Sequence, residues 1–347
     1  MEETLNNPQW VTLLCNAERN GGQRKMPFRA PKRLLWQIRL PGGVQSAPVQ
    51  AQEFLYVACL DGAIHAIDIA TGREAWKKQT GSRIRTTPAI SGDAVLFGND
   101  SGQIFAIDRT TGNGLWEAKT GAEVFASPVV LNGATFFGSA DGQFYALALE
   151  TGKLKWLFKP SARIYSTAYA TERNIYFGCG NGKVYCLRSS SGEVVWSADT
   201  GNGIDSSPAL TNGKVLIGSE DFSLYAFDAA SGSLCWKFPT GLGISSSPAV
   251  SGNTSLFGGK DGFLYAVDIS SGHLNWKKQL GIMTASPVVS GDVVLIQTFR
   301  DGTFALDIKT GEKVWFAKLG ASSQSCPVPS PNVIYLADQE GTVYALE

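Results

Sequence analysis

One position of a 40-residue repeat carries side chains that suit an anion-binding or protein-binding site. Arg85, Phe125 and Tyr165 follow one another at this spacing, and charged residues stand two places earlier in the same three repeats. The planar guanidinium of arginine can bond two oxygens of one carboxylate or phosphate at once. Arginine and aromatic side chains together are also typical of the energetic centre of protein interfaces. The candidate binding residues are Arg83, Arg85, Glu123, Phe125, Arg163, Tyr165, Asp205, Lys260, Arg300 and Gln324.

We expect these residues to bind a protein or an acidic peptide, with an anionic small molecule as the alternative ligand. A set of ordinary solvated loop residues would show the same composition, so that interpretation stays open beside the first. The overall charge is balanced, because 30 basic residues stand against 30 acidic ones. A chain without a basic field is not expected to bind nucleic acid or an acidic membrane surface.

Groups suited to acid–base, nucleophilic or metal chemistry are scarce. The two histidines are His65, at a strand position that other repeats fill with Phe or Tyr, and His273, beside a turn. We expect His65 in the core and His273 in solvent, and we find no paired carboxylates, Ser/His/Asp set or Cys/His pair. The six cysteines have no metal-binding spacing, and Cys59, Cys179 and Cys186 are expected to be buried free thiols. The sequence therefore predicts no enzyme, no catalytic residue, and no metal or cofactor.

The N-terminal residues indicate neither a secretory signal nor a membrane span. Residues 1–9 are polar, and the apolar run at residues 11–14 is too short for either. We therefore expect a cytoplasmic protein, or a periplasmic one if a leader has been removed. We also expect the chain to be a monomer.

The elements that position the candidate residues form one repeating unit, which is clearest at residues 246–278. Four short apolar runs alternate there with three turn signals, and the middle turn is Asp261-Gly262. A glycine in a tight hairpin turn supplies the positive φ that the turn requires. Four short strands joined by three turns in about 40 residues are the size of one propeller blade.

The repeat occurs eight times with almost no change in length. Tryptophan marks each copy, with six spacings of 40 residues and a last one of 39. The series is Trp36, Trp76, Trp116, Trp156, Trp196, Trp236, Trp276 and Trp315. The third run of each copy is apolar at consecutive positions, which is typical of a strand covered on both faces. The sequence therefore predicts an all-β, eight-bladed β-propeller of four-stranded antiparallel blades.

The two ends of the repeat region are complementary. Residues 34–40 match the fourth strand of a blade, and residues 324–346 match the first three strands of another. We expect the N-terminal strand to complete the last blade, because this closes the ring and removes an unpaired edge. The predicted domains are an extended leader at residues 1–33 and the propeller at residues 34–347.

The candidate binding residues should share one end of the ring. Strands alternate in direction within a blade, so the interblade loop before each first strand lies at the end that also carries the Asp-Gly hairpin. The turns at the other end are repetitive, whereas the interblade loops differ from blade to blade. Positions that the fold leaves variable are free to carry binding.

The segment Ala266–Trp276 resembles the tryptophan-docking motif of pyrroloquinoline-quinone (PQQ) repeat propellers, Ala-x-Asp-x-x-Thr-Gly-x-x-x-Trp. Seven copies cover nearly the whole ring, and the acid is replaced in two of them, at Ala148 and Arg188. The resemblance implies that the eight tryptophans are structural staples, each stacked against the neighbouring blade.

The family that the chain resembles contains three kinds of protein. Quinoprotein dehydrogenases bind PQQ and calcium, but they are much longer and typically carry adjacent cysteines, which this chain lacks. The second kind is the non-enzymatic scaffold, such as the propeller lipoprotein of outer-membrane assembly, which agrees in blade number and size. The third is a propeller domain appended to adenylating enzymes or kinases. The expected function is therefore a non-catalytic binding or scaffold propeller, with the other two as alternatives.

Overall fold

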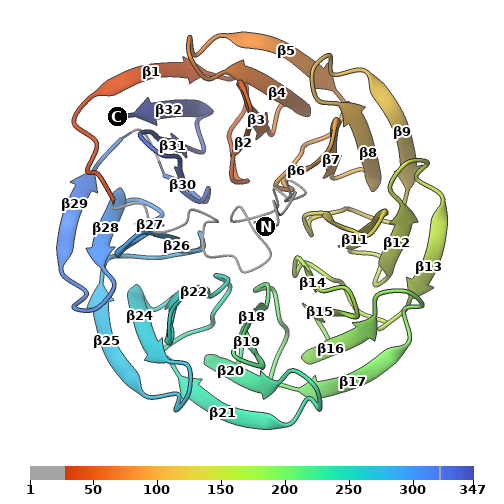
Figure 1. Ribbon diagram of the computed structural model, residues 1–347, viewed down its shortest axis with the longest axis vertical. Coiled ribbons are helices and arrows are strands. Elements are labelled where there is room, and N and C mark those ends of the chain that lie inside the picture. Colours follow the sequence, from red (N-terminus) through yellow and green to blue (C-terminus); the bar gives the residue numbers. More distant parts are fainter. Residues whose placement is uncertain (1–27, 320–321) are drawn as a thin grey trace, which may run out of the picture.

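The computed structural model of the chain describes residues 28–319 and 322–347, which form eight sheets of four strands around one axis (Figure 1). The described residues contain thirty-two strands, and no helix among them is long and apolar enough to cross a membrane. The prediction of an eight-bladed all-β propeller is thus confirmed. Most of the predicted leader, residues 1–27, lies outside the described residues.

Each blade has an innermost strand, two middle strands and an outer strand, and the innermost strands surround the axis in Figure 1. The innermost strands are β2 (Val49–Ala51), β6 (Ala89–Ser91), β10 (Val129–Leu131), β14 (Tyr169–Ala170), β18 (Ala209–Thr211), β22 (Ala249–Ser251), β26 (Val288–Ser290) and β30 (Val328–Pro329). The second strands are β3 (Phe54–Ala58), β7 (Ala94–Gly98), β11 (Ala134–Gly138), β15 (Asn174–Gly178), β19 (Lys214–Ser219), β23 (Thr254–Gly258), β27 (Val293–Gln297) and β31 (Ile334–Ala337).

The third and outer strands complete the blades. The third strands are β4 (Ala63–Asp68), β8 (Gln103–Asp108), β12 (Phe144–Ala148), β16 (Lys183–Arg188), β20 (Ser223–Asp228), β24 (Phe263–Asp268), β28 (Thr303–Asp307) and β32 (Thr342–Leu346). The outer strands are β5 (Glu74–Gln79), β9 (Gly114–Lys119), β13 (Leu154–Phe158), β17 (Val194–Asp199), β21 (Leu234–Pro239), β25 (Leu274–Gln279), β29 (Lys313–Ala317) and β1 (Leu34–Arg39). Blade 1 is β2–β5, and the blades are numbered from it along the chain.

Burial explains why the third strands are apolar at consecutive central positions. The four central residues of β24 are buried, whereas β25 is exposed except for its half-buried Trp276. Side chains on both faces of a third strand therefore pack against neighbouring blades, and the outer strand meets solvent.

The ring closes through the two ends of the chain. Strand β1 pairs antiparallel with β32, so the last sheet has the order β1-β32-β31-β30. Figure 1 shows β1, in red, along the rim beside β32, in blue. The backbone N–H groups of Lys32 and Arg33 donate to the carbonyl of Glu347 at 2.6 and 2.8 Å, and Arg33 forms an ion pair with the Glu347 side chain. The predicted closure of the eighth blade is confirmed.

The repeated tryptophans join neighbouring blades through hydrogen bonds as well as stacking. Six of them donate Nε1–H to a backbone carbonyl 32 or 33 residues further on, at 2.7 to 3.0 Å: Trp36, Trp116, Trp156, Trp196, Trp236 and Trp276. Trp236, for example, donates to Ile269 and lies against Gly272, where a Cβ would meet its ring at 2.8 Å. Each such bond ties an outer strand to the blade that follows it.

Two tryptophans depart from this pattern. The Nε1 of Trp76 is buried without a partner, and the carbonyl of Arg109, at the equivalent position, accepts the Tyr56 hydroxyl at 2.9 Å. Trp315 faces the closing blade and meets the Phe28 ring edge-on, with ring centroids 6.5 Å apart. The end of the predicted leader thus packs on the ring at Phe28.

A second set of interblade bonds lies close to the axis. Six backbone N–H groups, one in each of blades 1 to 6, donate to a buried Ser or Thr hydroxyl of the next blade at 2.9 to 3.2 Å. The donors are Ala47, Thr87, Ser127, Thr167, Ser207 and Ser247. These bonds fix the innermost strands and therefore the loops that lead into them.

Candidate binding site at the mouth of the axis

The interblade loops and the hairpins between second and third strands meet at one end of the ring, as the sequence predicts. The backbone N–H of Asp100, in a hairpin, donates to the carbonyl of Arg83, in an interblade loop, at 2.9 Å. The same bond recurs from Ala140 to Glu123 at 2.8 Å and from Gly180 to Arg163 at 2.9 Å. Each interblade loop is therefore held against the hairpin of the blade that it enters. We call this end the mouth.

Four candidate residues form one continuous row across blades 2 to 4. The Arg85 guanidinium lies 5.0 Å from the ring centroid of Phe125, and that of Arg163 lies 5.0 Å from the ring centroid of Tyr165. The two rings meet edge to face, with centroids 4.9 Å apart and planes at 83°. Cation–π and edge-to-face contacts of this kind are attractive. We call Arg85, Phe125, Tyr165 and Arg163 the arginine–aromatic row.

Carboxylates of the same end partly compensate the positive charge of the row. Arg85 forms an ion pair with Asp100 at 3.1 Å, and Arg163 lies 3.8 Å from Asp205. Burial raises the pKa of both carboxyl groups, and the neighbouring arginines counter only part of this effect. The Arg163 side chain is 51% exposed and that of Arg85 33% exposed, so each side chain reaches solvent in part.

The remaining candidate residues are not members of the row. Arg83 and Glu123 are exposed in the same interblade loops as Arg85 and Phe125. Lys260, in the hairpin of blade 6, forms an ion pair with Glu220 at 2.7 Å. The two others are Arg300, exposed in the hairpin of blade 7, and Gln324, half-buried before blade 8. The predicted set is thus one connected row on blades 2 to 4 with scattered members elsewhere on the mouth.

Burial changes the pKa of the thiol in three cysteines of the chain. Cys59, Cys179 and Cys186 are buried free thiols, as predicted, and burial raises the pKa of all three. For Cys59 the pKa rises to about 12, which leaves the thiol protonated at neutral pH and unsuited to nucleophilic attack.

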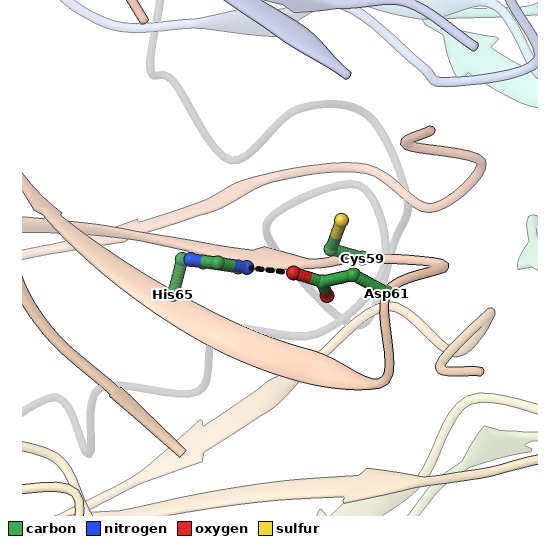
Figure 2. Close-up of side chains that lie close together, drawn as sticks. All are labelled: Cys59, Asp61 and His65. Carbon is green, nitrogen blue, oxygen red and sulfur yellow. Dashed lines mark hydrogen bonds and ion pairs between the residues drawn. The ribbon is translucent and has the colours of Figure 1, made fainter. Parts of the chain in front are cut away.

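A cluster of potential metal ligands in blade 1 was not predicted from the sequence, in which no Cys/His pair was found. Cys59, Asp61 and His65 bring one sulfur, one carboxylate oxygen and one ring nitrogen within 4.8 Å of one another (Figure 2). His65 is buried, as predicted, but it contacts two carboxylates instead of apolar side chains alone. Its Nε2 lies 3.1 Å from Asp61 and its Nδ1 lies 2.5 Å from Glu74. The signal available in the sequence was that Glu74 stands where other blades have Gly, Leu, Val or Lys.

The fold and the repeats define an eight-bladed propeller of the PQQ-repeat class. A family model described as outer membrane protein assembly factor BamB matches residues 29–120, 61–168 and 159–347. The chain belongs to this family. No curated protein matches the sequence.

Solved structures with the same fold include BamB and two dehydrogenases. BamB from Moraxella catarrhalis superposes with a TM-score of 0.79 at 18% identity, over 91% of this chain and 99% of that one. A europium-containing methanol dehydrogenase superposes with a TM-score of 0.78 at 15% identity, over 94% of this chain and 89% of that one. Quinohemoprotein alcohol dehydrogenase from Comamonas testosteroni superposes with a TM-score of 0.78 at 15% identity, over 98% of this chain and 80% of that one. At such identities the likeness concerns the fold.

Proposed function

We propose that this chain is a non-catalytic scaffold propeller that binds a protein partner at the mouth through the arginine–aromatic row. The observation that carries the proposal is the continuity of the row, in which two half-exposed arginines flank a packed pair of aromatic rings. Aromatic side chains and arginine are enriched among the residues that dominate binding energy in protein interfaces. The family, whose description is that of an assembly factor, supports a role in protein–protein contact.

The partner segment that suits this surface is an acidic peptide with at least one apolar or aromatic side chain. Its carboxylates would accept hydrogen bonds from Arg163 and from Arg83, which is exposed in the same interblade loop as Arg85. Because Asp100 and Asp205 already pair with the arginines of the row, an incoming carboxylate exchanges one partner for another. Charge then favours specificity and register more than affinity. An anionic small molecule is the alternative ligand.

A role in outer membrane assembly would require this chain to work outside the cytoplasm. The family description therefore favours the periplasmic alternative over the cytoplasmic expectation. The quinoprotein alternative rests on likeness of fold to PQQ-class dehydrogenases, and the appended propeller of a larger enzyme rests on resemblance alone. Stoichiometric uptake of PQQ and calcium with dye-linked alcohol oxidation would support the quinoprotein alternative instead.

The experiment compares two double variants for capture of the partner that co-purifies with the wild-type chain. Arg85→Ala with Arg163→Ala removes both cations of the row, and each lost contact should weaken binding by about 1–3 kcal/mol. Arg173→Ala with Arg188→Ala is the matched control, because both residues are exposed at the opposite end of the ring. Melting temperature should be nearly unchanged in both.

Two further outcomes decide the interpretation. Trp236→Ala should lower the melting temperature, because it removes an interblade staple, and it distinguishes loss of fold from loss of the site. Wild-type capture by the double variant of the row would show that the partner binds elsewhere on the ring.

A further inference from the structure

The hairpin of blade 1 carries three ligand atoms that differ in chemistry and lie close together. These are the Cys59 Sγ, an Asp61 carboxylate oxygen and a ring nitrogen of His65, all within 4.8 Å of one another. Figure 2 shows the His65 ring and the Asp61 carboxylate pointing toward each other, with the Cys59 side chain beside them. Cys59 and His65 are fully buried, and the Asp61 side chain is 14% exposed. The cluster therefore lies at the end of a buried strand pair with one side open to solvent.

In other blades a tyrosine stands at the position equivalent to His65 and contacts the hairpin aspartate. In blades 3 and 6 a tyrosine of the third strand donates its hydroxyl to the hairpin aspartate, as Tyr145 does to Asp141 and Tyr265 to Asp261, both at 2.6 Å. In that contact the tyrosine hydroxyl donates its one proton to the carboxylate, so no further partner is required for the donor. His65 replaces this tyrosine in blade 1, and a cysteine precedes the same aspartate.

Glu74 makes blade 1 different from every other blade. Its carboxylate lies 2.5 Å from His65 Nδ1, on the side of the ring opposite Asp61. A neutral imidazole has one N–H and one lone pair, so it can donate to only one of these carboxylates. The Nε2 side of the ring faces the Asp61 oxygen at 3.1 Å, so either a proton or a metal ion between the two atoms satisfies both of them. A carboxylate that orients a histidine in this way is common behind metal-ligating imidazoles.

We propose that Cys59 Sγ, Asp61 Oδ2 and His65 Nε2 bind a Zn²⁺ ion, with Glu74 as the positioning residue behind the histidine. Thiolate, imidazole and carboxylate are the usual protein ligands of zinc, at distances of about 2.0 to 2.3 Å. Three such ligands leave the fourth tetrahedral position to water, which can arrive on the exposed side of Asp61. The buried Cys59 thiol releases its proton to solvent as the sulfur bonds to the ion. This site goes beyond the proposed function at the mouth and is independent of the row.

The test uses the full chain, reduced and freed of metal by a chelator, with Zn²⁺ alone as the probe. We expect one equivalent of zinc to remain after gel filtration, measured by elemental analysis. With Co²⁺ in its place, a near-ultraviolet sulfur-to-cobalt charge-transfer band should appear, because a thiolate is among the ligands.

The repeat supplies variants that keep the fold. His65→Tyr installs the residue that blades 3 to 6 carry at this position, so the variant should fold and lose the zinc. Cys59→Ser should abolish the charge-transfer band. Cys179→Ser is the matched control, because Cys179 holds the equivalent buried position in blade 4 without a histidine, and it should leave both readouts unchanged. Glu74→Gln should weaken zinc binding by about 10- to 100-fold.

Each contrary result overturns the site. Absence of zinc from the wild-type chain would leave His65 as a structural link between the Asp61 and Glu74 carboxylates. Undiminished zinc in folded His65→Tyr, or an undiminished charge-transfer band in Cys59→Ser, would place the metal elsewhere in the chain.

Discussion

At the scale of single residues, the interblade staple is a pair made of a tryptophan and a glycine. Trp236 donates to the carbonyl of Ile269 at 2.9 Å and covers Gly272, whose φ is +74°. The sequence predicted the stacking tryptophan from its period, but it did not predict the hydrogen bond. The indole N–H can reach a carbonyl only when the neighbouring turn has a fixed orientation in space, and a linear pattern does not contain that orientation.

The pair can be tested by adding one methyl group. Gly272→Ala should destabilise the fold by about 2–4 kcal/mol, because it combines positive φ with a Cβ placed 2.8 Å from the Trp236 ring. Gly252→Ala is the matched control, since its φ is +57° and no atom lies within 4 Å of the added Cβ. Chemical denaturation of both variants isolates the contribution of the ring. Equal losses of stability would contradict the staple.

In the blade 1 cluster, the burial of His65 could be predicted from the sequence, but its two carboxylate partners could not. His65 occupies an aromatic position of a buried strand, so the pattern indicated a core side chain, and burial confirms it. Its partners are four residues earlier, in a hairpin, and nine residues later, on the next strand. Only the antiparallel pairing of β4 with β5 places Glu74 within reach of the ring.

At the scale of elements, β1 is the piece that completes the ring. The complementary ends of the repeat predicted its pairing with β32, because an incomplete blade at each end leaves one solution that has no open edge. The sequence did not predict that Phe28 would meet Trp315, where the other outer-strand tryptophans meet a glycine. In the eighth blade no glycine turn joins β32 to β1, because these two strands are not consecutive in the sequence.

Removal of residues 1–40 should expose the edge of β32 and cause aggregation, with a lower melting temperature for any monomer that remains. Removal of residues 1–27 is the control, since it leaves β1 and Phe28 in place. Size-exclusion chromatography with thermal melting makes the comparison. A monomeric chain of unchanged melting after the longer deletion would show that β1 does not close the ring.

At the scale of the whole molecule, repetition made the fold predictable and variation indicated the site. Eight copies in register fix the number of blades, the strand order and the end at which the interblade loops lie. The charge balance of the mouth was not predictable in the same way. Asp100 pairs with an arginine 15 residues away within blade 2, and Asp205 pairs with one 42 residues away on the preceding blade, so folding of the blades brings both pairs together.

Site-specific photocrosslinking in cells tests the central claim, that a protein partner binds at the mouth. A benzophenone amino acid would replace Arg83, which is exposed beside the arginine–aromatic row, or Arg173, which is exposed at the opposite end. Both replacements leave the buried strands untouched. We predict that the chain with the probe at position 83 crosslinks to one protein and that the chain with the probe at 173 does not. Crosslinking from position 173 alone would contradict the account and place the partner at the other end of the ring.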